Sequence, residues 1–329
     1  MNKSIASILI GLAIGIILIV LWLFTFDFSH FAETLRHLKL SYVALAGMFY
    51  LFAYFIRSVR WNLLLRKQTK LSIKDTWLIS AAGNWLNYLV PIRAGEVVKA
   101  VLVRKLKSVS AVSVMPSIFI DKFFDTLGIF FVLLLIPFVR ISASKGLNIL
   151  IILLILMFVI IFGILILAVT HKSRITSILQ ILFRWLPVKF RSKINHLIVL
   201  FIDGLNIFEH RRRVILYSIG LTSLGVLFDG MYFYLMFIAF NQNPGFLIVL
   251  FGYTLINLSY VLPQPPAQLG SNEWMMIIIF SLGFGLTRNI ASAIMVFAHL
   301  FTACIISVLG ILGFSYAGIK SVTQIKGEL

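Results

Sequence analysis

Long apolar runs alternate with short polar segments along most of the chain. Six of these runs are long enough to cross a membrane, because a helix needs about 20 apolar residues to span the hydrocarbon core of a bilayer. The six predicted spans cover residues 5–26, 42–65, 109–139, 147–170, 214–240 and 290–319. The pattern predicts an all-α, polytopic membrane protein in which residues 1–329 form a single transmembrane domain.

Two further apolar segments are shorter, and Pro, Gly and polar residues interrupt them. In the first, residues 77–92 lead into an amphipathic segment at 93–107. In the second, residues 246–262 are separated from 271–286 by a Pro-rich break at 263–270. A helix of about 16 residues rises about 24 Å, which is less than a hydrocarbon core of about 30 Å. We therefore predict two re-entrant hairpins, whose irregular tips must be buried in protein or face water.

Basic residues dominate the loops, since the chain has 29 Lys and Arg against 11 Asp and Glu, a net charge of +18. Most of them fall on one side of the predicted topology, as the positive-inside rule requires for cytoplasmic loops. We therefore predict a multi-pass protein of the cell membrane with both termini in the cytoplasm, in which residues 27–39 form a polar outer loop. Attraction to anionic lipid headgroups explains the charge better than nucleic acid does, so we expect no nucleic-acid partner.

The two broken segments resemble each other in sequence. NYLVP at residues 87–91 and LSYVLP at 258–263 share an aromatic residue, aliphatic residues and a Pro, and each is followed by a Gly and then by Glu96 or Glu273. Broken apolar segments at corresponding places in two halves are a sequence sign of a transport site. The predicted topology makes the hairpins enter from opposite faces, as an inverted repeat requires. The expected repeat halves are residues 41–139 and 214–319, joined by the span at 147–170 and a basic cytoplasmic loop at 171–213.

Motifs for cofactors and metals are absent from the sequence. It contains no phosphate-binding loop, no His/Cys metal cluster, no nucleophile elbow and no Gly-rich dinucleotide turn. The single cysteine, Cys304, excludes an intrachain disulfide and a Cys-based metal site. We therefore expect a protein without cofactor, metal or enzyme activity.

Ionisable side chains inside the predicted membrane region are the candidates for function. Each costs a few kcal/mol near the bilayer centre, so it normally faces the bundle interior and has a partner. The candidate site residues, which include two Asn of the first break, are Arg57, Arg60, Asn84, Asn87, Arg93, Glu96, Lys99, Asp121, Asp125 and Glu273. Asp229 and His299 also lie in predicted spans, and for both we expect a satisfied polar contact.

Three hairpin residues allow two interpretations each. Arg93 is suited to clamping a headgroup phosphate, because a guanidinium binds phosphate bidentately, but it could instead pair with Glu96 or Asp121 and hold the hairpin. Glu96 and Glu273 could bind a cation, a proton or the amino group of a lipid headgroup. They could equally cap the returning helix of each hairpin, as a carboxylate near a helix amino terminus does.

The remaining candidates favour structural contacts. For Asp121 and Asp125, which are four residues apart on one helix face, we favour ion pairs over an acid–base couple. Their expected partners are Arg57, Arg60, Arg93 and Lys122. We expect Asn84 and Asn87 to satisfy backbone groups that the break at the hairpin tip leaves free.

The ordered polar motifs resemble those of a known family. They stand here as Arg57-x-x-Arg60-Trp61, Asn87-x-x-x-Pro91-x-Arg93-x-Gly95-Glu96, Asp121-Lys122-x-x-Asp125 and Pro263…Gly270-x-x-Glu273. Over nearly its whole length the chain resembles the flippase-like, lysylphosphatidylglycerol synthase transmembrane-region family, also called the UPF0104 group. Members are integral membrane proteins. In the lysylphosphatidylglycerol synthases a related domain is thought to move the aminoacylated lipid to the outer leaflet, while a separate soluble domain performs the aminoacyl transfer.

Two positions depart from the family pattern. Asp121-Lys122 stands where the family usually has Glu-Arg, and PPAQLG at residues 265–270 stands where it usually has Gly-Gly-x-Gly. The stiffer turn leaves open whether the same headgroup is accepted. Because residues 1–329 leave no room for the soluble transferase, we do not expect this chain by itself to synthesise a lysyl-lipid.

The residues and the resemblance together predict a lipid translocase for an anionic or aminoacylated phospholipid or a polyprenyl-phosphate-linked lipid, with membrane lipids as its partners. Arg60, Arg93 and Lys99 are expected to hold the lipid phosphate in a polar cavity at the midplane. The carboxylates expected to balance this charge, which are also candidates for a coupling proton, are Glu96, Asp121 and Glu273. Three alternatives remain: a secondary transporter of a small soluble anion, an intramembrane enzyme acting on a lipid phosphate or polyprenol-linked sugar, and a non-catalytic membrane partner of a separate synthase or glycosyltransferase.

Overall fold

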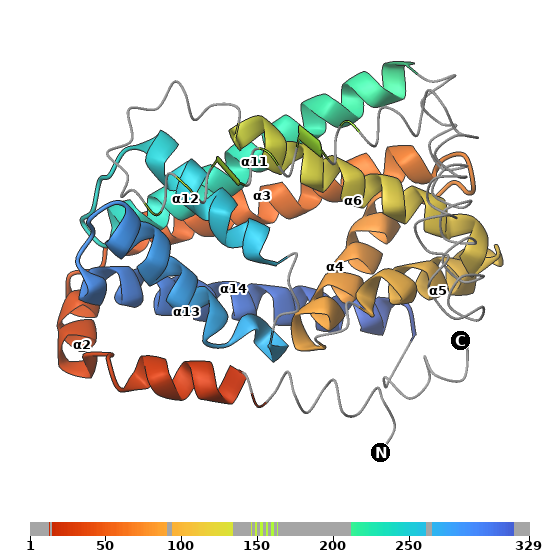
Figure 1. Cartoon of the computed structure of the whole chain (residues 1–329). Helices are drawn as coiled ribbons and strands as arrows, with labels where there is room; N and C mark the ends of the chain where they lie inside the picture. The colour runs from red at the N-terminus through yellow and green to blue at the C-terminus, as the bar shows by residue number, and fades with distance from the viewer. Residues whose placement is uncertain are drawn as a thin grey trace, which may run out of the picture.

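The regular structure is helical throughout the part of the chain that the structure describes. This computed structural model describes residue 13 and residues 15–90, 94–133, 212–260 and 265–318, together with scattered positions between 146 and 163. The helices pack as an elongated bundle in which the longest ones run along its length (Figure 1). This arrangement confirms the predicted all-α fold.

Three helices are long and apolar enough to span a membrane. They are α3 (Leu40–Leu65), α11 (Arg212–Ala239) and α14 (Arg288–Tyr316), with 26, 28 and 29 residues. The side chains of these helices are apolar on nearly all sides, as is typical of helices that lie between protein and lipid. All three coincide with predicted spans.

The other predicted spans are described less completely. Helix α6 (Ala111–Leu133) also runs along the bundle and carries the charged residues of its span in its middle. The first span is described as a helix only over Gly15–Leu23, and the span at 147–170 lies largely outside the described residues. A total of six spans therefore stays a prediction.

The first predicted hairpin is present as α4 (Ile73–Leu89) and α5 (Gly95–Lys107). Helix α4 begins with a capping box, in which Ser72 accepts from the backbone of Asp75 and the Asp75 carboxylate accepts from the backbone of Ser72. The two arms touch closely at their glycines, since a Cβ on Gly95 would clash with the carbonyl oxygen of Gly83. The absence of two side chains thus lets the arms fold against each other.

The second predicted hairpin consists of α12 (Phe246–Ser259) and a returning arm. The returning arm begins as α13 (Ser271–Met276) and continues as a π-helix over Ile277–Gly283. Between the arms, a 3₁₀ turn at Pro266–Gln268 lies at the tip, with Ala267 at φ 53°. The predicted break at 263–270 therefore lies where the structure interrupts the helix.

The two hairpins enter the bundle from opposite ends, and their tips approach each other near its middle (Figure 1). Helix α14 runs beside both tips and packs on α4 through Gly310, which faces Trp85, and Gly313, which faces Ala82. This opposite entry is what the predicted topology requires, while the internal repeat itself stays a prediction.

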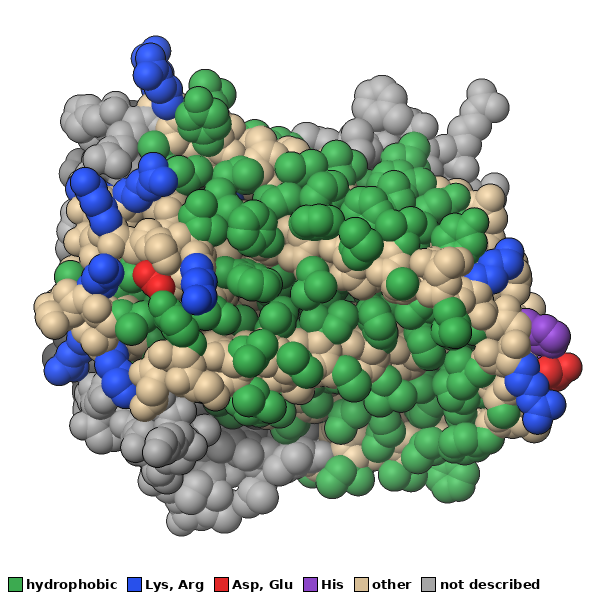
Figure 2. Space-filling model, turned by 180° about the vertical axis from the view of Figure 1, so that it is seen from behind, with side chains coloured by type: hydrophobic (Ala, Val, Ile, Leu, Met, Phe, Trp, Pro, Cys, Tyr) green, Lys and Arg blue, Asp and Glu red, His purple; other side chains and the backbone are tan. Residues whose placement is uncertain are grey.

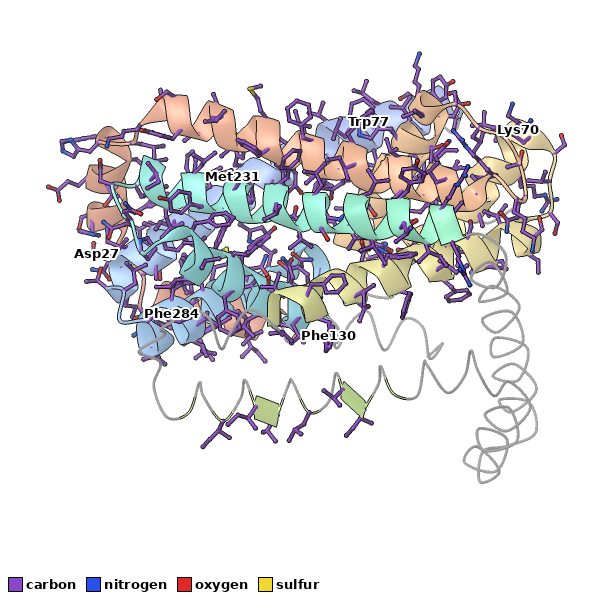
Figure 3. The ribbon with its side chains drawn as sticks, turned by 90° about the horizontal axis from the view of Figure 1, so that it is seen from above. Asp27, Lys70, Trp77, Phe130, Met231 and Phe284 are labelled. Carbon is purple, nitrogen blue, oxygen red and sulfur yellow. The ribbon has the colours of Figure 1, made fainter. Side chains whose placement is uncertain are left out.

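The two ends of the bundle carry the predicted outer and inner loops. Asp27 and Phe284 lie at one end, and Lys70 lies at the other (Figure 3). Between the ends, apolar side chains form a broad belt on the face seen in Figure 2, with Lys and Arg gathered at the ends. A belt of this kind is the surface that an integral membrane protein presents to lipid.

One local prediction needs a correction, because residues 27–39 are not simply a loop. They contain the helix α2 (Phe28–Arg36), which is bent by 80° from the preceding segment Gly15–Leu23. The Asp27 side chain accepts from the backbone N–H of His30 and so caps α2. A polar segment between two apolar runs does not by itself distinguish a loop from a short capped helix.

Each hairpin lies in its own apolar core. One core combines the second hairpin with parts of α3, α11 and α14, and the other combines the first hairpin with the opposite end of α3 and the start of α6. Along α3 the order is Tyr50 in one core, then Arg57 and Arg60, then Trp61 in the other core. Polar residues therefore lie between two apolar regions of the same bundle.

Candidate functional site

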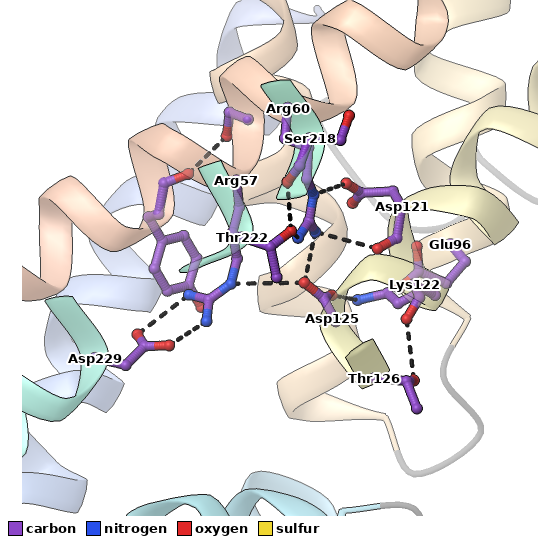
Figure 4. Close-up of polar contacts among 12 residues, drawn as sticks. Arg57, Arg60, Glu96, Asp121, Lys122, Asp125, Thr126, Ser218, Thr222 and Asp229 are labelled. Atoms are coloured by element: carbon purple, nitrogen blue, oxygen red, sulfur yellow. Dashed lines mark hydrogen bonds and ion pairs between the residues drawn. The ribbon is translucent and has the colours of Figure 1, made fainter. Parts of the chain in front are cut away.

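Eight charged side chains meet where α3, α5, α6 and α11 come together (Figure 4). We call this group the charge cluster; its members are Arg57, Arg60, Lys99, Lys122, Glu96, Asp121, Asp125 and Asp229. Four formal positive charges therefore face four formal negative charges, and the cluster is balanced as it stands.

Arg60 is the buried centre of the charge cluster, with a side chain that is 1% exposed. Its Nε donates to Asp121 Oδ1 at 2.8 Å, and its Nη2 donates to Asp125 Oδ1 at 2.5 Å. Its Nη1 donates to the Thr222 hydroxyl on α11 at 2.9 Å. One planar guanidinium thus joins three helices, a role for which its fixed fork of donors is suited. These contacts confirm the ion pairs that we favoured for both aspartates.

Arg57 lies on the same face of α3, one helical turn before Arg60. Its guanidinium donates through two nitrogens to the Asp229 carboxylate on α11, and its Nε lies 3.7 Å from Asp125 Oδ1. The satisfied polar contact that we expected for Asp229 is therefore confirmed. The two arginines together link α3 to α6 and α11 (Figure 4).

Lys122 connects the charge cluster to the first hairpin. Its Nζ lies 3.2 Å from Glu96 Oε1 and 3.4 Å from Asp125 Oδ2. The other oxygen of Glu96 lies 3.3 Å from Lys99 Nζ, and Lys99 is buried with its ammonium 5.8 Å from the ring centroid of Trp61. The hairpin is thus held to α6 by charge as well as by packing.

Asn87 closes the tip of the first hairpin. Its Oδ1 accepts from the backbone N–H of Gly95 at 2.7 Å, and its Nδ2 donates to Glu96 Oε1 at 3.0 Å. The first contact satisfies an amide at the start of α5, which confirms the role that we expected for Asn87. Glu96 lies in the first turn of α5 and also makes two ion pairs, so its geometry fits both of its interpretations.

Exposure differs sharply across the charge cluster. The side chains of Arg60 and Lys99 are 1% and 5% exposed, whereas those of Arg57, Asp125 and Lys122 are 33%, 30% and 40% exposed. The two buried cations have little access to other anions, whereas the two exposed cations, Arg57 and Lys122, each have a side on which an anion could approach. The cluster therefore has a structural interior and an accessible face.

A second polar group lies where the two hairpin tips meet α14. We call it the tip cluster; its members are Tyr88, Ala267, Glu273 and His299. Nδ1 of His299 lies 2.6 Å from Glu273 Oε1, and its Nε2 lies 2.8 Å from the Ala267 carbonyl and 3.0 Å from the Tyr88 hydroxyl. The polar contact expected for His299 is confirmed, although its partners were not foreseen.

The other predicted site residues fall outside these two groups. Asn84 is half-buried on α4, one turn before Asn87, and belongs to neither cluster. Arg93 lies outside the described residues, so its role and the midplane cavity stay predictions. Among the described residues, no group of three or more His, Cys, Asp or Glu is placed to hold a metal ion.

Three neighbours of the candidate residues are not themselves among the predicted site residues. Lys122 and Thr222 bind candidate residues directly, and Tyr88 connects α4 to His299. Lys122 is predicted only as an ion-pair partner of the two aspartates, which its contact with Asp125 confirms, while its contact with Glu96 is not predicted. Thr222 is an ordinary residue in an apolar helix, and no spacing marks it. Tyr88 is the aromatic residue of the NYLVP segment at 87–91, but the segment does not indicate its partner.

Comparison with known proteins agrees with this architecture. The family model of the lysylphosphatidylglycerol synthase transmembrane region matches residues 8–310. A UPF0104 membrane protein of Methanocaldococcus jannaschii is 23% identical over 280 residues, which cover 82% of this chain and 83% of the relative. A UPF0104 membrane protein of Methanothermobacter thermautotrophicus is 25% identical over 293 residues, which cover 84% of each chain. No solved structure matches the chain. The chain thus belongs to the lysylphosphatidylglycerol synthase transmembrane-region family, whose members include the UPF0104 proteins.

Proposed function

We propose that this integral membrane protein is a translocase, not an enzyme, that moves a lipid with an anionic or aminoacylated phosphate headgroup between leaflets. Phospholipids and polyprenyl-phosphate-linked lipids both present this chemistry. Both termini are assigned to the cytoplasmic side of the cell membrane, where the basic loops favour them. The observation that carries the proposal is the half-exposed face of the charge cluster.

A charge cluster of this size is a poor way to stabilise a fold. Each buried ion costs several kcal/mol of desolvation, and well-packed apolar residues often stabilise a protein as well or better. Four cations held beside four carboxylates are therefore better explained by a ligand that uses them. Lys122 and Arg57 are the cations of the cluster with an accessible side. Lysine and arginine side chains commonly bind phosphate oxygens in proteins.

Charge balance indicates how a headgroup would bind. The charge cluster is formally neutral, so a phosphate that enters it adds one negative charge. Arg93, which lies outside the described residues, precedes Glu96 by three residues in the sequence and is a further cation close to the cluster along the chain. Its charge would restore the balance when a headgroup binds, in agreement with the phosphate clamp that we predict for it. An aminoacylated headgroup would in addition offer an amino group to the carboxylates of the cluster.

Lys122 offers the sharpest test, because its removal leaves neither carboxylate alone. Glu96 keeps Lys99, and Asp125 keeps Arg60. In proteoliposomes with labelled lipids, we expect Lys122→Gln to slow translocation by about tenfold or more, since a hydrogen bond to a charged group contributes about 1.5–3 kcal/mol. Lys122→Arg should retain transport, because it keeps the charge and adds donors.

The matched control is Arg36→Gln, which removes an exposed cation from α2 at the end of the bundle. We expect this variant to translocate lipid at the wild-type rate. Full transport by folded Lys122→Gln would contradict the assignment of the site. Uptake of inorganic phosphate without movement of any lipid would favour the soluble-anion transporter instead.

A further inference from the structure

The imidazole of His299 forms hydrogen bonds with the tips of both hairpins. His299 projects from α14 to Glu273 at the start of the second hairpin's returning arm, to the Ala267 carbonyl at that hairpin's turn, and to Tyr88 at the end of α4. The segment around Ala267 adopts left-handed conformations, with φ 53° at Ala267 and 57° at Gln268. Such conformations are unfavourable for residues other than glycine, and a turn of this kind is maintained where its geometry is needed.

The partners of Nε2 fix the state of that nitrogen. The Ala267 carbonyl can only accept a hydrogen bond, and it lies 2.8 Å from Nε2. Nε2 therefore carries a hydrogen, because two lone pairs would repel each other at this distance. The Tyr88 hydroxyl, at 3.0 Å, can accept from the same hydrogen.

The contact between Nδ1 and Glu273 then requires a second proton. An ionised carboxylate and an unprotonated Nδ1 are both acceptors, so they could not remain 2.6 Å apart. Either Glu273 is a neutral acid that donates to Nδ1, or His299 is an imidazolium that donates to the carboxylate. In both cases the pair is neutral overall and has bound one proton that a deprotonated pair would lack.

The pair is buried, so the loss of this proton would place a charge away from water. The side chains of Glu273 and His299 are 4% and 7% exposed, and Glu273 Oε2 is buried without a hydrogen-bond partner. Loss of the proton would leave a net negative charge in a place that water scarcely reaches, which is costly. Among the described residues, Tyr88 of α4 and Tyr260 beyond α12 interact with Glu273, and Tyr54 of α3 and Cys304 of α14 lie near Tyr88; all four are acids that are ordinarily neutral near pH 7.

The two clusters are joined through consecutive residues of α4. Asn87 bonds Glu96 in the charge cluster, and Tyr88 bonds His299 in the tip cluster. Because Tyr88 and the Ala267 carbonyl share Nε2 of His299, a movement of the second tip away from His299 would change the hydrogen bond of Tyr88, which lies next to the residue that bonds Glu96. The proposed headgroup site and the Glu273–His299 pair are therefore both in contact with the end of α4.

We propose that Glu273 and His299 form a proton-binding site whose loaded state holds the two hairpin tips together and whose unloaded state releases them. On release, the proton passes to water, the pair acquires one negative charge, and the short contact between Nδ1 and the carboxylate breaks. The proton would then be the coupling ion of the translocase, a statement that rests on the proposed function. The release of the tips does not depend on it.

The distance between the tips tests the site directly. Spin labels are attached at Leu89→Cys and Leu269→Cys, two exposed positions beside the tips, in a Cys304→Ser background. The distance distribution is measured in lipid from about pH 4 to about pH 9, a range that includes the ordinary pKa values of Glu, about 4.3, and of His, about 6.5. We expect the wild-type pair to give short distances at low pH and longer ones at high pH.

Two variants should remove this pH dependence in opposite directions. In Glu273→Gln the amide donates to Nδ1 permanently, as the neutral acid does, so the distance should stay short at every pH. In His299→Phe both contacts are lost, so the distance should stay long. Glu33→Gln, which removes an exposed carboxylate from α2, should keep the wild-type pH response.

A wild-type distance that is constant over this pH range would overturn the proposal, as would an unchanged pH response in Glu273→Gln. Lipid movement under an imposed pH gradient separates this inference from the proposed function. A distance that responds to pH without lipid movement would leave the proton site in place and contradict the translocase. Lipid movement that ignores the gradient, with a constant distance, would leave the translocase in place and contradict the proton site.

Discussion

At the scale of single residues, neighbouring charges in one cluster have different tasks. Arg60 is surrounded by partners on α6 and α11, whereas Lys122 has an accessible side. The presence of charged residues in these spans was predictable from sequence, and so were the favoured pairs of Asp121 and Asp125. Which cation would be buried was not, because Arg60 and its partner Thr222 are 162 residues apart and only the packed bundle brings them together.

Removal of Arg60 should therefore affect folding before transport. Arg60→Gln removes the cation that pairs with both Asp121 and Asp125. Removal of one partner from a buried ion pair typically lowers the free energy of unfolding by about 3–5 kcal/mol. We expect a clear loss of melting temperature for this variant in detergent, and little change for Lys122→Gln. Equal melting temperatures for Arg60→Gln and wild type would contradict the structural role of Arg60.

At the scale of elements, both hairpins lie close to where the sequence pattern placed them. In the first hairpin, α4 ends at Leu89 and α5 begins at Gly95. The predicted segments were 77–92 and 93–107. The breaks were predictable from the sequence, because Pro interrupts a helix and Gly permits backbone conformations that other residues avoid. Helix α2 was missed, because the segment is short and its only start signal is the Asp27 cap.

The contact between the arms of the first hairpin depends on the missing side chain of Gly95. We expect Gly95→Ala to disrupt the hairpin, because the added Cβ would clash with Gly83 and with the Asn87 side chain. Gly220→Ala is the matched control on α11, where a Cβ meets no atom within 4 Å and alanine favours the helix by about 1 kcal/mol. Thermal unfolding should therefore occur earlier in the first variant and no earlier in the second. Equal stability of both variants would show that the arms are not in close contact.

At the scale of the whole molecule, two hairpins from opposite ends meet beside α14 and bring two polar clusters into one apolar bundle (Figure 1). The opposite entry was predictable, because the basic loops fix which side each hairpin begins on. The link between the tips was not predictable, since Tyr88 and His299 are 211 residues apart. Long-range pairs of this kind carry the coupling that we propose between headgroup and proton.

If the accessible face of the charge cluster carries phosphate headgroups across the bilayer, the protein must distinguish lipids by their headgroups. Purified protein is reconstituted with labelled anionic phospholipid, aminoacylated phospholipid, polyprenyl phosphate or a zwitterionic phospholipid, with inorganic phosphate as the soluble arm. Arg93→Ala serves as the variant that removes the predicted clamp. We predict that at least one anionic or aminoacylated class moves much faster than the zwitterionic lipid and that its movement requires Arg93. If folded protein moves no lipid class faster than it moves in protein-free vesicles, the protein is not a lipid translocase.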